Sequence, residues 1–423
     1  MSDLKEQVLA AATASRTASV EMRSLSRAQK DKALLAIADA LESNTNAIES
    51  ANKIDVAIAV EKGTDPAIVD RLTLNQSRIK DIANAVREVA ALEDPVGSVI
   101  REFTLPNGLE IKQIRVPMGV VAMIYEARPN VTVDAAVLVL KSGSAALLRG
   151  SASAYNTNVV LTDIMRAAIE SVGIAKDAIV LVPGTDHESV KYVMTARGLV
   201  DVIIPRGGAG LIESVVTGST VPVIETGIGN CHLFIDETAD LEKALAIAIN
   251  AKTQRVSVCN SLETILVHKN IADEFLPRLM EAFKEKNVTV HGTKEFSELA
   301  ESTGTKFLPV TDQDWACEYY SLDIAAGVVD SMEAAIAHIQ KWSTGHTEAI
   351  VTENQANADR FVQAIDSAAV MVNASTRFTD GGEFGFGAEI GISTQKLHAR
   401  GPMGLAEITS SKFVVKGNGQ TRN

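Results

Sequence analysis

The chain has 423 residues, a formal net charge of −13, and a composition that is 46% hydrophobic and 22% charged. This length predicts about two to three domains, and an acidic chain without a basic cluster argues against a nucleic-acid partner, because binding phosphates needs grouped Lys and Arg. Three widely spaced cysteines, no apolar run of roughly 20 residues and no signal-peptide core in the N-terminal segment predict a cytoplasmic protein without a membrane partner that acts on a small molecule.

The first predicted elements are helical. Between residues 24 and 60, apolar side chains recur at the i, i+3, i+4, i+7 spacing of an amphipathic helix, and Ser24 or Ser26 can cap its start. Farther along, Asn107-Gly108 stands between two alternating apolar runs, which is the signature of a tight β-hairpin. We expect this hairpin to project before the main sheet as a docking arm.

From residue 120 to residue 224, short β-branched runs alternate with helical segments. The predicted strands are Val120–Tyr125, Ala145–Leu148, Ile179–Val182, Val200–Ile204 and Val221–Ile224. The predicted helices lie near Asp134–Lys141, Tyr155–Ser171, Glu188–Ala196 and Ala209–Val216. This alternation is typical of a parallel sheet with right-handed crossovers, so we expect a Rossmann-like layer that binds ligands at the carboxyl ends of its strands.

A second α/β set begins near Asn230. Its predicted strands are Leu233–Ile235, Thr264–Val267, Ala325–Val329, Ala349–Val351 and Ala369–Val372. The helices predicted between them include Leu241–Ala251 and Asp273–Phe283, which are strongly amphipathic. Near the C-terminus, the strand-like run Lys412–Lys416 can pair with the hairpin of its own chain or of a neighbouring subunit.

Cys259 is the first candidate for chemistry. It follows a predicted amphipathic helix and precedes an apolar strand, and Arg255 stands four residues upstream. Positive charge beside a partly exposed thiol favours the thiolate, which is a good nucleophile. A lone cysteine is more often a small buried hydrophobic residue, and Cys259 taken alone is better explained in that way.

Several motifs follow one another along nearly the whole chain and change this assessment. They are Pro117–Thr132, Ile204–Gly208, Gly229–His232, Ser343–Ile350, Asn373–Phe378 and Gly401–Leu405. Together they resemble the γ-glutamyl phosphate reductase branch of the aldehyde dehydrogenase superfamily. The resemblance implies an α/β fold with two Rossmann-like parallel-sheet domains plus a β-hairpin oligomerisation arm. It divides the chain into a cofactor-binding domain (residues 1–101 and 116–228), a catalytic domain (229–395) and the arm (102–115 and 396–423).

The resemblance also implies the catalytic residues. Cys259 is the expected nucleophile and Asn130, at the end of a strand, is the expected oxyanion-hole donor, because preorganised N–H groups stabilise the charge that grows on a carbonyl oxygen under attack. Glu225 stands where hydrolytic members carry a general base. Since a reductase should avoid hydrolysis, Glu225 is a weak catalytic candidate.

No G-x-G-x-x-G fingerprint occurs, but this superfamily binds its cofactor by a different route. Three glycine-containing loops after predicted strands can direct N–H groups at phosphates. The expected cofactor-binding residues are Arg149, Gly150, Ser151, Pro183, Gly184, Arg206, Gly207 and Gly208, with Glu318 for the nicotinamide ribose. Because no carboxylate follows Arg149, a ribose 2′-phosphate meets no repulsion and can pair with that arginine. The expected cofactor is therefore NADPH/NADP rather than NAD.

The implied substrate, L-glutamate 5-phosphate, carries carboxylate, ammonium and phosphate groups. Arg128, Arg255 and Arg377 are the expected substrate-binding residues, because a guanidinium binds carboxylate or phosphate through two parallel hydrogen bonds. Any single arginine is more often a solvated surface residue, and only its place in these loops favours a site. The histidines are isolated and lack a second ligand at usable spacing, so we expect no metal.

The resemblance thus implies NADPH-dependent reduction of L-glutamate 5-phosphate to L-glutamate 5-semialdehyde and phosphate through a thioester on Cys259, the second step of proline biosynthesis. Two other hypotheses stay open. One is another acyl-phosphate or acyl-CoA reductase of the same superfamily. The other is an inactive scaffold that shelters a kinase, although a scaffold has no need of Cys259 and Asn130 together. A separate glutamate 5-kinase is a candidate partner, and the arm predicts a homo-oligomer.

Overall fold

The computed structural model describes residues 2–422 as two compact units. Unit 1 contains the chain up to Thr226, the segment Phe386–Gly391 and the residues from Met403 onward, and unit 2 contains Gly227–Gly385 and Ile392–Pro402. The predicted domain boundary after residue 228 falls just beyond Thr226. The outer ends of the predicted cofactor-binding domain and arm, Met1 and Asn423, lie outside the described residues.

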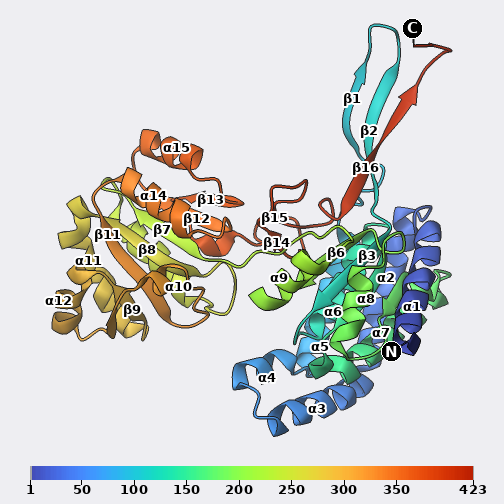
Figure 1. Cartoon of the computed structure of the whole chain (residues 1–423), viewed down its shortest axis with the longest axis horizontal. Coiled ribbons are helices and arrows are strands. Elements are labelled where there is room, and N and C mark those ends of the chain that lie inside the picture. The colour runs from blue at the N-terminus through green and yellow to red at the C-terminus, as the bar shows by residue number, and fades with distance from the viewer. Residues whose placement is uncertain (1, 423) are drawn as a thin grey trace. The chain divides into compact units, whose positions relative to one another are not determined.

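Unit 1 begins with a layer of helices (Figure 1). They are α1 (Ser2–Met22), α2 (Arg27–Ser43), α3 (Thr45–Glu61), α4 (Pro66–Leu72) and α5 (Gln76–Ala91). The helical prediction for residues 24–60 is confirmed as two helices, because Asn44 ends α2 and starts α3. Ser26 begins α2 with a capping box, in which the serine hydroxyl accepts from the Gln29 N–H and the Gln29 side chain accepts from the Ser26 N–H.

The sheet of unit 1 has four parallel strands in the order β5-β4-β3-β6. The strands are β3 (Val120–Tyr125), β4 (Ala145–Gly150), β5 (Ile179–Leu181) and β6 (Val202–Arg206). They are followed in turn by α6 (Asn130–Lys141), α7 (Tyr155–Ser171), α8 (His187–Met194) and α9 (Ala209–Gly218), with 3-10 turns η1 (Ala152–Ala154) and η2 (Lys176–Ala178). The strand order reverses between β3 and β6. The carboxyl ends of these two strands therefore form the topological switch point, where open α/β sheets bind ligands.

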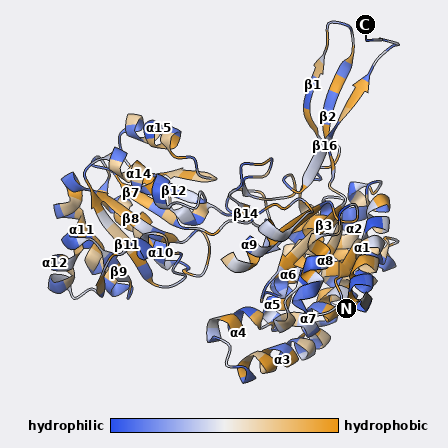
Figure 2. Cartoon of the chain, in the orientation of Figure 1, coloured by the Kyte–Doolittle hydropathy of each residue, from blue (hydrophilic) through white to orange (hydrophobic). Residues whose placement is uncertain are grey.

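The predicted strand Val221–Ile224 is wrong. Only a single bridge joins Val223 to Ile203 of β6, because Pro222 has no N–H to continue a ladder. The remaining strands of this sheet are confirmed. All six residues of β3 are buried, as expected for a parallel strand covered on both faces, and the strands of both units carry mostly hydrophobic residues (Figure 2).

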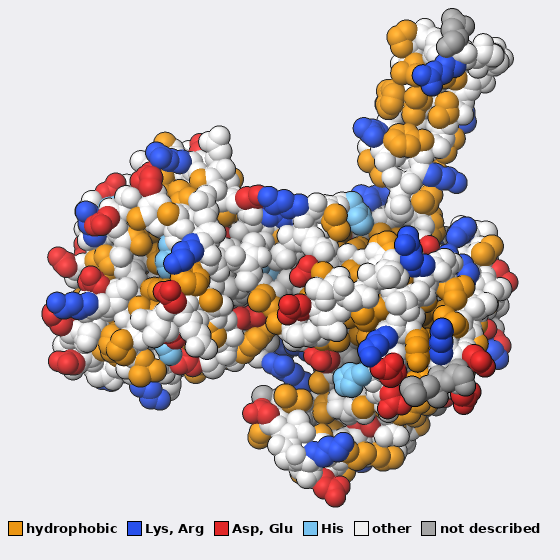
Figure 3. Space-filling model, viewed as in Figure 1, with side chains coloured by type: hydrophobic (Ala, Val, Ile, Leu, Met, Phe, Trp, Pro, Cys, Tyr) orange, Lys and Arg blue, Asp and Glu red, His pale blue; other side chains and the backbone are white. Residues whose placement is uncertain are grey.

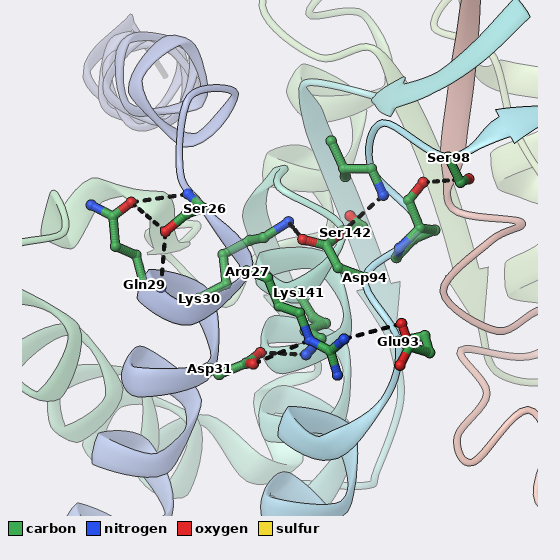
Figure 4. Close-up of polar contacts among 12 residues, drawn as sticks. Ser26, Arg27, Gln29, Lys30, Asp31, Glu93, Asp94, Ser98, Lys141 and Ser142 are labelled. Carbon is green, nitrogen blue, oxygen red and sulfur yellow. Dashed lines mark hydrogen bonds and ion pairs between the residues drawn. The ribbon is translucent and has the colours of Figure 1, made fainter.

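Buried charges fix α2 against its neighbours in unit 1 (Figure 4). The Lys30 ammonium lies 2.6 Å from Asp94, and the Lys30 side chain is 1% exposed. Lys141, the last residue of α6, binds Asp31 and a main-chain carbonyl of α5. Because a buried charge without a partner is costly, these pairs specify how α2 packs between α5 and α6.

A three-stranded antiparallel ladder projects from unit 1 (Figure 1). β1 (Val99–Thr104) and β2 (Glu110–Pro117) form the predicted hairpin, and β16 (Thr409–Lys416) pairs with β2 of the same chain. Apolar side chains gather on its surface (Figure 3). Those that are 43–55% exposed are Val99, Ile100, Phe103, Phe413 and Val415.

Unit 2 is built on a seven-stranded parallel sheet in the order β10-β9-β11-β8-β7-β12-β13. The strands are β7 (Cys231–Ile235), β8 (Leu262–His268), β9 (Thr289–Gly292), β10 (Phe307–Pro309), β11 (Asp323–Val329), β12 (Thr347–Val351) and β13 (Ala369–Val372). The helices are α10 (Leu241–Thr253), α11 (Lys269–Glu285), α12 (Lys294–Thr303), α13 (Asp312–Trp315), α14 (Met332–Trp342) and α15 (Gln355–Ala364), with the 3-10 turn η3 (Thr376–Phe378). β14 (Ile392–Ser393) and β15 (Gly401–Pro402) form a short antiparallel pair. All five predicted strands are confirmed, whereas the short β9 and β10 carry no long apolar run and were not predicted.

Candidate functional site

Two predicted site residues of unit 2, Cys259 and Glu318, lie with Gly229 and His346 in loops at the amino ends of its strands. Because the strands are parallel, the loops before them share one edge of the sheet. Gly229 precedes β7, Cys259 precedes β8, Glu318 precedes β11 and His346 precedes β12. In open α/β sheets, ligands usually bind at the carboxyl ends of the strands. This rule applies to the sheet of unit 1, whereas the residues named here in unit 2 lie at the opposite, amino ends.

Cys259 lies on the loop from α10 to β8 and is partly exposed. Its carbonyl oxygen accepts a hydrogen bond from the Cys231 thiol, with the sulfur 3.3 Å away. On the other side Gly229 approaches so closely that a β-carbon there would lie 1.5 Å from the same oxygen. The main chain of the predicted nucleophile is therefore held by two contacts, one of which only glycine permits.

Glu318 extends this arrangement. One carboxylate oxygen accepts from the Gly229 N–H at 3.0 Å, and the other accepts from the Tyr320 hydroxyl at 2.6 Å. Tyr320 has a φ of 55°, in the left-handed region, a strain of roughly 1–3 kcal/mol that clusters at functional sites. Burial raises the pKa of Glu318. Each carboxylate oxygen can accept a second hydrogen bond, so a ribose hydroxyl could still bind Glu318. This contact remains a prediction.

A buried ion pair, not foreseen from the sequence, lies beside this edge. Lys252 in the last turn of α10 and Glu263 in β8 are both fully buried, and the ammonium lies 2.7 Å from the carboxylate. Desolvation lowers the pKa of Lys252 and raises the pKa of Glu263 to about 7. Burial raises the pKa values of Cys317 and Tyr320, and the charge of Glu263 adds to both shifts. The only signal in the sequence was a lysine on the apolar face of an amphipathic helix.

Arg377, on η3, lies close to Cys259. The Arg377 Nε donates to the Gln254 side chain at 2.7 Å, and the Asn260 amide donates to the carbonyls of Arg377 and Thr379 at 3.3 and 2.9 Å. Burial, followed by repulsion from Arg255, lowers the pKa of Arg377, while the charge of Asp380, and then that of Cys259 when it is ionised, opposes the shift. The structure therefore brings three predicted residues of unit 2 together: Cys259, Arg255 and Arg377.

In unit 1, Asn130 lies at the switch point. It is the first residue of α6, not the end of a strand, and follows a strained turn in which Ala127 has a φ of 38°. The Asn130 amide donates to Asp134 at 2.9 Å. Desolvation raises the pKa of Asp134 to about 6. Because an amide carries two hydrogens, Asp134 can orient the group while the second hydrogen serves an oxyanion.

The other predicted residues of unit 1 near this point are Arg128 and Glu225. Arg128 is half-buried in the loop before α6. Glu225 is half-buried in the coil that ends unit 1, directly before Thr226. Their predicted roles in substrate binding and catalysis remain predictions.

Arg149 does not point outward as the predicted 2′-phosphate contact requires. Its side chain is almost completely buried, and its guanidinium donates to the carbonyls of Gly150, Thr185 and Asp186 at 2.8, 3.1 and 2.9 Å. Gly150 is a glycine for packing reasons, since a β-carbon would lie 2.1 Å from the Asn158 amide. Arg149 thus shapes the loop that also contains the predicted residues Pro183 and Gly184. These internal hydrogen bonds could not be read from the sequence.

The N-terminus of α9 can hold an anionic oxygen. The Gly208 N–H donates to the Glu126 carboxylate at 2.9 Å, and a β-carbon on Gly207 would lie 2.5 Å from the same oxygen. The positive end of a helix dipole favours such a charge. Arg206, the last residue of β6, lies near Asp134 and helps to stabilise its carboxylate. These residues fit a cofactor phosphate, which would replace the Glu126 carboxylate at this helix end.

Residues 2–422 offer neither a metal centre nor a membrane-spanning helix. Within that range, no three or more His, Cys, Asp or Glu side chains are grouped so as to hold a metal ion. His232, for example, is fully buried and its Nδ1 lies 3.0 Å from Glu348. None of the helices in the same range combines the length and the apolar character that crossing a membrane requires.

Known proteins resemble this chain along its full length. The sequence model of the aldehyde dehydrogenase family matches residues 2–298. The gamma-glutamyl phosphate reductase of Thermobifida fusca (strain YX) is 60% identical over 422 residues, 100% of both chains, and that of Kineococcus radiotolerans is 54% identical over 99% of this chain and 97% of its own. The crystal structure of gamma-glutamyl phosphate reductase from Thermotoga maritima superposes with a TM-score of 0.95 at 47% identity, covering 99% of this chain and 100% of that one.

Proposed function

The chain belongs to the aldehyde dehydrogenase family, and from this we propose that it reduces γ-glutamyl phosphate to L-glutamate 5-semialdehyde and phosphate in proline biosynthesis. The relatives named gamma-glutamyl phosphate reductase support this substrate over the whole chain. The structural observation that carries the proposal is Cys259, partly exposed, with its main chain held by Gly229 and with Arg377 beside it.

The proposed reaction starts at the Cys259 thiolate. Sulfur attacks the acyl carbon, a C–S bond forms, the bond from carbon to the phosphate oxygen breaks, and inorganic phosphate leaves. The nicotinamide cofactor, when bound, supplies a hydride to the thioester carbon. The resulting thiohemiacetal expels the thiolate and releases the aldehyde. The covalent route is useful because phosphate departs before reduction, so one crowded step becomes two.

Negative charge develops on the acyl oxygen in both steps. The second amide hydrogen of Asn130 and the Cys259 N–H are the proposed donors to this oxygen. Losing one such donor typically costs about 10²- to 10³-fold in rate. Asp134 is a positioning residue in this scheme, because it holds the Asn130 amide at 2.9 Å.

The family uses nicotinamide cofactors, and the finer proposal is NADPH. Supporting it, β4 ends at Gly150 and is followed by Ser151, so no carboxylate stands where NAD-binding enzymes often clasp a ribose 2′-hydroxyl. Gly207, Gly208 and the α9 N-terminus would receive the cofactor phosphates. Arg149 contributes by holding the Thr185 and Asp186 carbonyls, since its own hydrogen bonds are directed to the protein.

The proposal extends to the setting of the enzyme. The ladder formed by β1, β2 and β16 would join copies of the chain into a homo-oligomer through its exposed apolar side chains. The three cysteines, none in a disulfide, agree with a reducing cytoplasm. A separate glutamate 5-kinase would supply the acyl phosphate, which hydrolyses readily and benefits from direct transfer.

The test is a phosphate-dependent assay in the reverse direction, with L-glutamate 5-semialdehyde, phosphate and NADP. Formation of NADPH is followed by absorbance, with NAD as the comparison. Cys259→Ser should abolish turnover, whereas Cys317→Ser, a matched change at another partly exposed cysteine of unit 2, should retain it. Full activity of Cys259→Ser would exclude the covalent mechanism. In the forward direction, preference for β-aspartyl phosphate or an acyl-CoA would favour a different reductase of the family.

A further inference from the structure

Unit 2 contains a small polar cavity beside the loop that carries Cys259. Its volume is about 270 Å³, less than the roughly 300–1,000 Å³ of drug-sized sites. Its lining comes from α10, the loop that follows it, η3 and the segment beyond η3. The lining residues are Asn250, Gln254, Arg377, Phe378, Asp380 and Glu383.

One donor in this lining lacks a partner. The Arg377 Nη1 is buried and has no hydrogen-bond partner within the described part of the chain, whereas the Nε of the same guanidinium donates to Gln254 at 2.7 Å. Leaving a buried charged donor unsatisfied is costly, because its desolvation is not offset by a hydrogen bond. The orientation of Arg377 is thus set by Gln254, and its unsatisfied Nη1 leaves a positive charge in the wall of the cavity that the protein does not fully compensate.

The charges around Arg377 indicate what kind of anion fits. Asp380 and Glu383 also line the cavity, so within this lining two carboxylates accompany the Arg377 guanidinium, while Arg255 lies close enough to repel that guanidinium. A phosphate carrying up to two negative charges would be repelled by both acids. A zwitterion is complementary, because its carboxylate can meet the guanidinium while its ammonium meets the acids.

The cavity is linked to the nucleophile through Asn260, the residue after Cys259. The Asn260 amide donates to the carbonyls of Arg377 and Thr379, and its own carbonyl accepts from the Thr376 hydroxyl at 2.8 Å. The charge of Cys259 also acts on Arg377 directly. The cavity and the nucleophile therefore belong to one hydrogen-bonded loop region of unit 2.

We propose that this cavity is the α-amino-acid site of the enzyme, where Arg377 binds the α-carboxylate of the substrate and Asp380 and Glu383 bind its α-ammonium. The assignment rests on the proposed function, and it makes Asp380 and Glu383 specificity-determining residues for an aldehyde or acyl phosphate that carries an amino acid head.

The experiment compares two aldehydes in the phosphate-dependent assay: L-glutamate 5-semialdehyde and 5-oxopentanoate, which keeps the carboxylate but lacks the amino group. The variant is Asp380→Asn/Glu383→Gln. The Asn side chain can still accept from the Gly382 N–H, as Asp380 does at 2.8 Å, so the turn is preserved and only charge is lost. Glu301→Gln, an exposed change on α12, is the control for net charge.

For glutamate semialdehyde, kcat/KM of the double variant should fall about 10- to 100-fold, which is the effect expected from losing a charge-assisted hydrogen bond. For 5-oxopentanoate, kcat/KM should change by less than about twofold. Arg377→Lys should lower kcat/KM for both aldehydes, since both carry the carboxylate. Glu301→Gln should change kcat/KM for neither.

The outcomes separate the two proposals. If the parent enzyme turned over neither aldehyde, the proposed function would be overturned. Turnover by the parent with equal losses for both aldehydes in the double variant, or with no loss, would overturn the amino-acid site alone. So would an unchanged kcat/KM in Arg377→Lys. Activity of the double variant on 5-oxopentanoate also reports that it is folded.

Discussion

Replacing Gly229 by alanine tests the structure of the catalytic loop directly. The added β-carbon would lie 1.5 Å from the carbonyl oxygen of Cys259, whereas real β-carbons essentially never come closer than 3.0 Å to such an atom. One of the two main chains must therefore retreat by about 1.5 Å, because neither contact atom is the end of a flexible side chain. A misplacement of about 1 Å at a reacting group can cost 100-fold in rate. We expect Gly229→Ala to lower kcat by about 100-fold or more.

The fold should survive this change, since Gly229 lies in a loop and the buried strands of unit 2 are untouched. Far-UV circular dichroism and the urea midpoint should therefore stay close to those of the parent, while alkylation of Cys259 by iodoacetamide changes in rate. Gly210→Ala is the matched control, because a β-carbon there meets no atom within 4 Å and the residue lies in α9. A kcat for Gly229→Ala equal to that of the parent would refute the close approach and the argument built on it.

Three further predictions concern stability and assembly. In urea titrations, Lys252→Met should lower the free energy of unfolding by roughly 3–5 kcal/mol, because Glu263 stays buried without its partner. The double variant Lys252→Met/Glu263→Leu should recover most of this loss. Equal losses in the two variants would contradict the ion-pair argument. Because the folded-state pKa of Asp134 is raised to about 6, its contribution to stability is present at low pH and lost as pH rises through 6. Asp134→Asn should thus melt above the parent at pH 8, with the gap closing below about pH 4. Phe413→Asp, at a side chain 55% exposed on β16, should reduce the sedimentation coefficient if the ladder joins subunits, and an unchanged multimer would exclude this surface.

The fold was predictable where local sequence and tertiary environment agree. β3 and α7 have the bounds that were expected, since a six-residue β-branched run and a long amphipathic repeat leave little ambiguity. The Asn-Gly turn likewise specified the hairpin of β1 and β2. The expected strand at Val221–Ile224 failed because its apolar pattern could not reveal that Pro222 interrupts the ladder.

The site was predictable only in part. The family resemblance implied roles for Cys259 and Arg377, the position of Arg255 near the thiol suggested a third residue, and the structure brings these three together, while their roles remain predictions. The contact of Gly229 with Cys259 depends on β7 and β8 being neighbours in the sheet, and the inward turn of Arg149 depends on loops distant in the sequence, so no local pattern encodes them. For the pair of Lys252 and Glu263, the sequence offered only a lysine on the apolar face of a helix.

The electrostatic setting of Cys259 explains why arginines, rather than a helix, must stabilise its thiolate. Reactive cysteines often lie at the positive N-terminus of a helix, but Cys259 follows the C-terminal end of α10, whose carbonyls carry partial negative charge. The nearby cation that interacts with its charge is Arg377. If the α-carboxylate of a substrate binds Arg377, it neutralises part of that cation and the thiolate becomes more basic. Such binding would lower the fraction of thiolate while raising the nucleophilicity of each thiolate, so the proposed amino-acid site and the sulfur are electrostatically coupled.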